Sequence, residues 1–356
     1  MNNIKKIQEK LIEKNLDAVL VTDEKNQRYA TGFPFTDGAV IVARSAAWLI
    51  TDSRYIEAAT NTAACCCNVQ MFDREHSRLS LIQAALKEAG VERLGAEEEK
   101  LSHAEYLGYE KALGMELLPA QAIFSELRAS KSEEEIGYLR EAQAISEKAL
   151  AEVLRIIKPG MTERQVAAEL VYHMLLNGSE GNSFDPIVIT GKKTSMPHGV
   201  PGDEVIHEGD FVTMDFGCLK HGYCSDMTRT IALGYVSEKM DKVYHTVLEA
   251  QLAGIAATKA GVAGREMDAA ARNVINAAGF EGCFGHSYGH SLGLLIHEGP
   301  YANTRNDKPM PAGAVVSAEP GIYIPDEFGV RIEDVTVITE TGCEILTKSP
   351  KNLIIL

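Results

Sequence analysis

The feature that most restricts the fold of this 356-residue chain is a duplication within its second half. The segment KPGMTERQVAAEL, which begins at Lys158, resembles KAGVAGREMDAAAR, which begins at Lys259. Further on, HEGDFVTMDFG (207–217) resembles MPAGAVVSAEPG (310–321). The offset drifts from 101 at the first pair of segments to 104 at the second, as two copies with small insertions would drift. We therefore expect two half-domains that arose by duplication and have equivalent elements.

The duplication places acidic residues at equivalent positions in stretches that are otherwise apolar. Asp215 matches Glu319, and Asp226 lies near the match of Glu333 in VRIEDVTVI. Four carboxylates that lie close together raise one another's pKa, so cations must neutralise them if all are to stay ionised. Two divalent ions about 3.5–4 Å apart, bridged by shared carboxylates and a water, are an arrangement known for hydrolysis.

The spacing of the first two acids predicts a β-hairpin. The numbers of Asp215 and Asp226 sum to an odd value, so a hairpin that pairs them directly turns at Lys220-His221. This two-residue loop is the commonest hairpin connection. In that register both carboxylates leave the same face of the sheet, with roughly 5 Å between their Cβ atoms.

The second pair of acids predicts a similar hairpin. Glu319 and Glu333 are separated by an even number of residues and centre on Asp326, so an odd-length loop would place them opposite one another. Two hairpins would then bring four acids to one site, and GHSYGHSLGLLIHEGP could add an imidazole, with His290 nearest its Gly-rich turn. The alternative is that a single buried acid is paired with an arginine, as Glu333 could be with Arg331.

The first part of the chain has a different pattern. Residues 1–125 alternate helix-like stretches with short apolar runs (DAVLVT, GAVIVA, AWLITD), which is typical of an α/β domain. Ser132 and Glu135 then form a capping box at the start of a long helical pattern. The predicted domains are residues 1–125 and 126–356.

The charge of the chain argues against some partners. Its 35 basic and 50 acidic residues give a net charge of −15, and no Lys/Arg-rich run interrupts this balance. We therefore expect neither nucleic acid nor a membrane surface as a partner. The first turns spread charge through MNNIKKIQEKLIEKNLDAVLV, which favours a cytoplasmic protein over one with a signal peptide.

Five ordered motifs of the second half point to one family. They are DFG...YCSDMTRT, MPHG, GHSLGLLIHE, SAEPGIY and VRIED, and they resemble the "pita-bread" metallopeptidases, in particular the proline-specific branch with aminopeptidase P and prolidase. The first half is similar to the smaller creatinase-like domain of that branch through NQRYATGF and TDSRY. The resemblance implies an α/β (α+β) fold, in which a pita-bread catalytic domain with an internal pseudo-two-fold repeat follows a creatinase-like α/β domain.

The resemblance implies a centre of two divalent metal ions. Its five ligands would be Asp215, Asp226, His290, Glu319 and Glu333, of which Asp226 and Glu333 would bridge both ions. Most members of the family use Mn²⁺ or Co²⁺, and some use Zn²⁺. An oxygen-rich set of ligands favours a hard ion such as Mn²⁺.

The resemblance also implies roles in catalysis and substrate binding. Glu319 would pass the proton of the attacking water to the leaving proline nitrogen. Arg331 and Tyr323 would orient Glu333 and that water. The histidines that would contact the substrate or line the active site are His198, His297 and His286.

The implied activity is hydrolysis of the Xaa-Pro bond at the N-terminus of peptides, by a homodimer. Some archaeal-type dipeptidases follow the last His-Glu with Trp-Pro-Arg, whereas this chain has Gly299-Pro300-Tyr301 there. This difference favours an Xaa-Pro aminopeptidase and leaves an Xaa-Pro dipeptidase (prolidase) open. A creatinase-type or non-catalytic member is a remote alternative, because none of the ligands is missing.

A second remote alternative is a serine hydrolase. GHSLG (289–293) matches the G-x-S-x-G nucleophile elbow, with Ser291 as the nucleophile. That motif needs an apolar strand before it, and GFEGCFGHSY is too rich in glycine to form one. We expect Ser291→Ala to retain full activity.

Overall fold

The computed structural model describes residues 2–356. The chain divides into two compact units, Met1–Arg128 and Ala129–Leu356, where the sequence predicted domains of residues 1–125 and 126–356. Among residues 2–356, no helix combines the length and apolar character that a membrane span requires.

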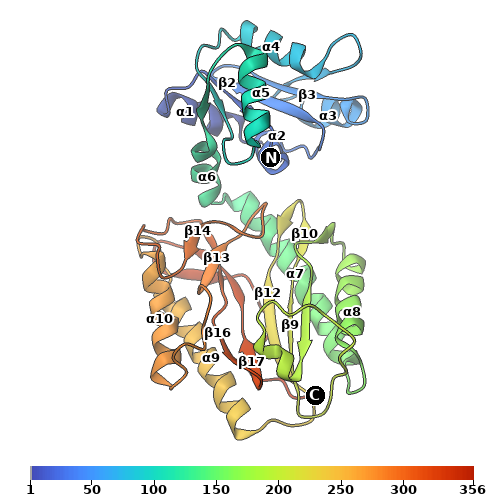
Figure 1. The fold of residues 1–356 in the computed structure, drawn as a ribbon, viewed down its shortest axis with the longest axis vertical. Coiled ribbons are helices and arrows are strands. Elements are labelled where there is room, and N and C mark those ends of the chain that lie inside the picture. The colour runs from blue at the N-terminus through green and yellow to red at the C-terminus, as the bar shows by residue number, and fades with distance from the viewer. Residues whose placement is uncertain (1) are drawn as a thin grey trace. The chain divides into compact units, whose positions relative to one another are not determined.

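The first unit is a mixed β-sheet with helices (Figure 1). Its strands lie in the order β4-β3-β2-β1-β5-β6, with antiparallel pairs at β1–β2 and β2–β3 and parallel pairs elsewhere. Helices α4 and α5 pack on one face, over a core that contains the fully buried Trp48 and Ile41. The elements are α1 (Ile4–Glu13), β1 (Ala18–Val21), α2 (Glu24–Thr31), β2 (Gly38–Ala43), β3 (Ala47–Thr51), α3 (Ile56–Ala63), β4 (Asn68–Met71), α4 (Arg78–Glu88), β5 (Leu94–Ala96), α5 (His103–Leu113), β6 (Leu117–Pro119) and α6 (Gln121–Ala129).

The second unit contains two successive sets of paired helices and antiparallel strands. The first set is α7 (Glu133–Ile156), α8 (Glu163–Leu176), β7 (Gly181–Asn182), β8 (Ile187–Thr190), the 3₁₀ helix η1 (Gly191–Ser195), β9 (Phe211–Phe216), β10 (Cys218–Lys220), β11 (Tyr223–Cys224) and β12 (Met227–Ala232). The second set is α9 (Glu238–Ala257), α10 (Gly264–Ala277), β13 (Gly289–Ser291), β14 (Glu298–Ala302), β15 (Val315–Ala318), β16 (Gly321–Ile324), β17 (Phe328–Arg331), β18 (Asp334–Ile338) and β19 (Cys343–Ile345).

The duplication in the sequence corresponds to equivalent places in these two sets. Each Lys-x-Gly segment leads into the second helix of a pair, which begins at Glu163 in one set and at Gly264 in the other. The residue before each helix also forms an isolated β-bridge to a later segment, Thr162 with Val205 and Ala263 with Pro309. Figure 1 shows α7 and α8 next to the strands of the first set and α9 and α10 next to those of the second. The predicted fold class is confirmed, and so is the capping box of Ser132 at the start of α7.

The first hairpin has a different register from the predicted one. It turns at His221-Gly222 rather than at Lys220-His221. Both turn residues have positive φ, 50° and 73°, which is the backbone of a type I′ turn with glycine at its second central position. The prediction that Asp215 lies directly opposite Asp226 is therefore wrong, because glycine determines where this chain turns.

The second hairpin has the predicted register. Strands β16 and β17 pair Gly321 with Arg331 and leave a three-residue loop centred on Asp326. Extended by two residues, this register places Glu319 opposite Glu333. The centre of the hairpin predicted from the two glutamates is confirmed.

Candidate active site

The two sets of strands enclose a cavity of about 390 Å³ in the second unit. It brings together nine of the ten residues predicted for the site, and the tenth, Tyr323, contacts two of them. The residues that line the cavity are Phe184, Ile187, Pro197, His198, Asp215, Asp226, His286, Ser287, His290, Ile296, His297, Tyr301, Glu319, Arg331 and Glu333.

Strand geometry places the first two acids on one face. Asp215 lies in β9 and pairs across the sheet with Thr228 of β12. Asp226 precedes Thr228 by two residues, and residues two apart along a strand share a face. The acids are thus diagonal neighbours rather than directly opposed. Although the register differs from the predicted one, the two carboxylates still share one face of the sheet, as predicted.

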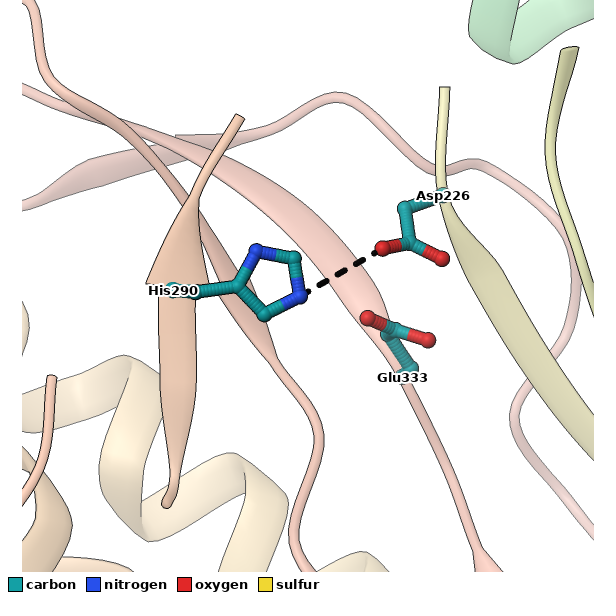
Figure 2. Close-up of side chains that lie close together, drawn as sticks. All are labelled: Asp226, His290 and Glu333. Atoms are coloured by element: carbon teal, nitrogen blue, oxygen red, sulfur yellow. Dashed lines mark ion pairs between the residues drawn. The ribbon is translucent and has the colours of Figure 1, made fainter. Parts of the chain in front are cut away.

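The remaining carboxylates and the imidazole come from the second set of strands. Glu319 lies between β15 and β16, Glu333 between β17 and β18, and His290 in β13. Figure 2 shows His290, Asp226 and Glu333 directed toward one another, and one ligand atom from each lies within 4.8 Å of the others. His290 Nε2 is 3.5 Å from an oxygen of Asp226 and 3.3 Å from an oxygen of Glu319.

The acids carry a large electrostatic cost. Burial raises the pKa of Asp226 well above its usual value, and the nearby carboxylates of Asp215 and Glu319 raise it further. Burial likewise raises the pKa of Glu333, with Asp226 as the next cause. For Glu319, burial raises the pKa to about 7 despite the opposing charge of Arg331. The protein side chains therefore do not balance the negative charge of this site.

The buried guanidinium of Arg331 pairs with a different acid from the predicted one. Its Nη2 lies 2.6 Å from an oxygen of Asp215, while its Nε donates to Thr228. The hydroxyl of Thr228 donates to Glu333 at 2.8 Å, so Arg331 reaches Glu333 only through this threonine. The alternative in which Glu333 forms an ion pair with Arg331 is not observed, because the long side chain extends across to β9. The predicted role of Arg331 in orienting Glu333 stays a prediction, and Thr228 provides the connection between them.

The donor set fits a divalent cation. One oxygen of Asp215 and one of Glu333 are buried, and neither has a hydrogen-bond partner among the described residues. A buried carboxylate oxygen without a partner is costly, and a bound cation removes this cost. Carboxylate oxygens and one imidazole are ligands that Mn²⁺, Co²⁺ and Zn²⁺ accept.

The other two predicted partners form a chain of hydrogen bonds with Arg331. Arg331 Nη1 donates to the Tyr323 hydroxyl at 2.9 Å, and that hydroxyl lies 2.8 Å from His286 Nε2. His286 Nδ1 faces the carbonyl of Ser287 at 2.9 Å, which requires a proton on Nδ1 and leaves Nε2 as the acceptor. Burial lowers the pKa of His286 to about 3, so this imidazole is neutral.

The two histidines predicted to contact the substrate lie at the wall of the cavity. His198 follows η1 and His297 precedes β14, and both are exposed. The rings of His290 and His297 meet edge to face, with centroids 4.3 Å apart. The cavity therefore has an acidic floor and imidazoles at its accessible edge.

Two contributors to the site were not predicted. Thr228 donates to Glu333, and Ser317 donates to Glu319 at 3.0 Å. The Ser317 hydroxyl also accepts a hydrogen bond from the backbone of His290. Each lies two residues from an acid, Thr228 after Asp226 and Ser317 before Glu319. Residues two apart in a strand share a face, so this spacing could have identified both hydroxyls as neighbours of the site.

The serine proposed as an elbow nucleophile does not line the cavity. Ser291 is fully buried in β13, and its hydroxyl donates to the carbonyl of Val315 at 2.7 Å. A nucleophile needs a free path to its substrate and a base that takes its proton. The position of Ser291 argues against the serine hydrolase alternative.

Comparisons with known proteins agree with this geometry. Residues 137–340 match Metallopeptidase family M24, and residues 3–130 match the Creatinase/Prolidase N-terminal domain. The chain is 35% identical over 353 residues to the Xaa-Pro dipeptidase of Pyrococcus horikoshii, with 99% of this chain and 98% of that protein covered.

Solved structures give the same result. An Xaa-Pro dipeptidase from Bacillus anthracis has a TM-score of 0.95 at 42% identity, with 99% of each chain covered. An X-Pro aminopeptidase from Thermotoga maritima has a TM-score of 0.93 at 35% identity, covering 98% of this chain and 99% of that one. The chain therefore belongs to metallopeptidase family M24, as a metallo-exopeptidase with a creatinase-like N-terminal domain and a pita-bread catalytic domain.

Proposed function

We propose that this metallo-exopeptidase hydrolyses Xaa-Pro bonds at a centre of two metal ions. The observation that supports this most strongly is a cavity that gathers four acids and one imidazole, in which two buried carboxylate oxygens have no partner among the described residues. The proposed ligands are Asp215, Asp226, His290, Glu319 and Glu333. Among residues 2–356, one arginine pairs with these four acids, so at least three further positive charges are needed to balance them when all four are ionised.

We propose Mn²⁺ as the ion of this centre, with Co²⁺ and Zn²⁺ as alternatives. Four of the five proposed ligands are carboxylates, and carboxylate-rich sites suit hard ions. Two bound ions would supply polarisation of the scissile carbonyl and a lowered pKa for the attacking water. Asp226 and Glu333, the two most deeply buried of the four acids, are the proposed bridging ligands.

The residues of the chain perform the proton transfers and hold the substrate. Glu319 accepts a hydrogen bond from Ser317 through Oε1, which leaves Oε2 to take the proton of the attacking water and pass it to the proline nitrogen. His198 and His297 lie at the cavity edge, where they can donate to the peptide carbonyl and to the oxyanion that forms from it.

For the length of the substrate we propose the Xaa-Pro dipeptide first. Proteins named Xaa-Pro dipeptidase are similar to this chain over nearly its whole length, at 42% and 35% identity. This reverses the order expected from the sequence. The aminopeptidase remains a second candidate because Tyr301 lines the cavity where a Trp-Pro-Arg dipeptidase motif would place its arginine, and because an X-Pro aminopeptidase is similarly close in structure.

Hydrolysis of Ala-Pro and Ala-Pro-Ala in the presence of Mn²⁺ tests this proposal. We expect release of alanine from Ala-Pro, little from Ala-Pro-Ala and none from the control Ala-Ala. Cleavage of Ala-Pro-Ala with an equal or higher kcat/KM would favour the aminopeptidase. If neither proline peptide is cleaved, the proposed function is wrong.

The predicted homodimer and cytoplasmic location remain proposals. A proline-containing peptide is the proposed partner of the site. Light scattering of the purified protein measures the oligomeric state, and a monomer would contradict the homodimer. Localisation of the tagged chain in its own cell would test the compartment.

A further inference from the structure

A buried lysine lies next to the active-site histidines without lining the cavity. Lys131 precedes α7, and its side chain is 1% exposed. Its ammonium is 2.9 Å from an oxygen of Glu298, whose side chain is 8% exposed, and donates to the Ser291 hydroxyl at 2.9 Å. The Lys131 backbone donates to the carbonyl of Gly313, so the lysine is anchored at both ends.

The two partners of Lys131 each adjoin a histidine of the site. Ser291 follows the proposed ligand His290, and Glu298 follows His297. Within the segment 290–298, each of the two residues that contact the Lys131 ammonium therefore directly follows a histidine of the cavity. The two imidazoles, with centroids 4.3 Å apart, are the side chains that this arrangement holds together.

The segment between the histidines is folded closely around this ion pair. A Cβ on Gly293 would lie 2.5 Å from Glu298 Oε1 and 3.1 Å from Lys131 Cε, so a side chain there would displace the carboxylate of the ion pair. The backbone of Leu295 donates to the second oxygen of Glu298. The carbonyl of Gly293 accepts from the backbone of Cys224, two residues before Asp226, and this bond ties the segment to the first hairpin.

The contacts distinguish Lys131 from a catalytic base. Its ammonium faces a carboxylate, and the Ser291 hydroxyl donates to Val315 rather than to the lysine. None of these three residues lines the cavity. A buried ion pair is a costly way to hold a fold together, because well-packed apolar side chains often serve as well or better. The two contacts of Lys131, with the residue after His290 and with the residue after His297, indicate another role.

We propose that Lys131 is a positioning residue that sets the His290 and His297 imidazoles through Ser291 and Glu298. This inference rests on the proposed function for the role of His290 as a ligand. Partners that orient a ligand from outside the metal centre typically change metal affinity or activity by about 10–100-fold when they are removed. The fixed charge of Lys131 would thus act on the reaction without touching substrate or metal.

Comparing a single with a double variant tells whether Lys131 positions the two imidazoles or only neutralises the charge of Glu298. Lys131→Met removes the ammonium from the buried Glu298 carboxylate, whereas Lys131→Met with Glu298→Gln removes both charges at once. Lys148→Met is the matched control, since Lys148 lies exposed on α7. For each protein, calorimetry measures the Mn²⁺ affinity, and kinetics on Ala-Pro give kcat and KM. Thermal stability and amide hydrogen exchange over residues 286–302 are measured on the metal-free form.

We expect the double variant to fold with stability near that of the parent, but with Mn²⁺ affinity and kcat/KM lower by at least about tenfold. Exchange over residues 286–302 should be faster in both Lys131 variants and unchanged in Lys148→Met. A double variant with the affinity, kcat/KM and exchange of the parent would overturn the proposal and leave a purely structural ion pair. If the parent does not cleave Ala-Pro, the proposed function fails, while the exchange comparison still tests the role of Lys131.

Discussion

Glu333 and Asp334 are neighbours in the chain, are both buried, and have opposite surroundings. Asp334 is bonded to Arg229 at 2.9 Å and to Lys351 at 2.7 Å, and it also accepts from Gln251. Glu333 shares its site with three other acids, and one of its oxygens has no hydrogen-bond partner among the described residues. Neighbouring residues in an extended chain point to opposite sides, so one backbone serves both environments.

The difference shows how a buried acid that stabilises the fold can be distinguished from one that binds a cation. Burying a charge is costly unless it is paired, and the cations around Asp334 provide that pairing. The charge of Arg331 acts on Glu333, but this guanidinium is bonded to Asp215, and burial and acidic neighbours raise the pKa of Glu333. Charge that the protein leaves unbalanced in a cavity indicates a missing cationic ligand.

Of the variants considered, Asp226→Asn should cause the largest loss of activity. The substitution removes a proposed bridging ligand, so we expect kcat/KM to fall by at least about 10³-fold, beyond the 10–100-fold typical of outer partners. It also relieves repulsion between carboxylates, so the metal-free variant should be as stable as the parent or more so. Kinetics on Ala-Pro and thermal unfolding of the metal-free proteins measure both. A variant that unfolds yet keeps its activity per folded molecule would make Asp226 a structural residue.

Asp334→Asn should have the opposite outcome. It leaves Arg229 and Lys351 without their carboxylate, and the side chain of Arg229 is only 2% exposed. We expect a loss of about 3 kcal/mol in the free energy of unfolding, as for other broken buried ion pairs. Denaturant unfolding measures this loss, and kcat/KM per folded molecule should fall far less than in Asp226→Asn. Equal losses of activity in the two variants would erase the distinction between the two acids.

Arg331→Met should have an intermediate effect on activity. The guanidinium holds Asp215, Thr228 and Tyr323 in place, and its removal also leaves the acids without their nearest cation. We expect kcat/KM to fall by about 10–100-fold, because the arginine orients proposed metal ligands and is not itself a ligand. Raising the Mn²⁺ concentration should recover part of the activity. Tyr323→Phe, which keeps the ring and removes one hydrogen bond, should lose less, and a greater loss in Tyr323→Phe would contradict this ranking.

Much of the fold followed from local patterns in the sequence. The duplication predicted two equivalent sets of elements, and the even spacing of Glu319 and Glu333 predicted a hairpin centred on Asp326, as observed. The first hairpin shows where spacing alone fails. The odd spacing of the two aspartates favoured a turn at Lys220-His221, but the positive φ of a type I′ turn is better met with Gly222 at its second central position.

The partners of the charged side chains were harder to predict. Arg331 was expected beside Glu333 because they are close in sequence, yet its guanidinium reaches Asp215, which lies 116 residues away. Lys131 and Ser291 are 160 residues apart, and no periodicity links them. Such contacts depend on how helices and strands pack against one another. The packing also determines which of several nearby acids a long side chain contacts. The sequence therefore predicts which residues gather at the cavity better than it predicts which of them pair.

The most direct test of the central proposal is the number of Mn²⁺ ions that the chain binds. The unbalanced acids around Glu333 predict two ions per chain in the parent, measured by calorimetric titration of the metal-free protein together with metal analysis after dialysis. Asp334→Asn should also bind two, and Asp226→Asn fewer. A parent protein that binds no Mn²⁺, Co²⁺ or Zn²⁺ while remaining folded would contradict the proposal that these acids form a metal centre.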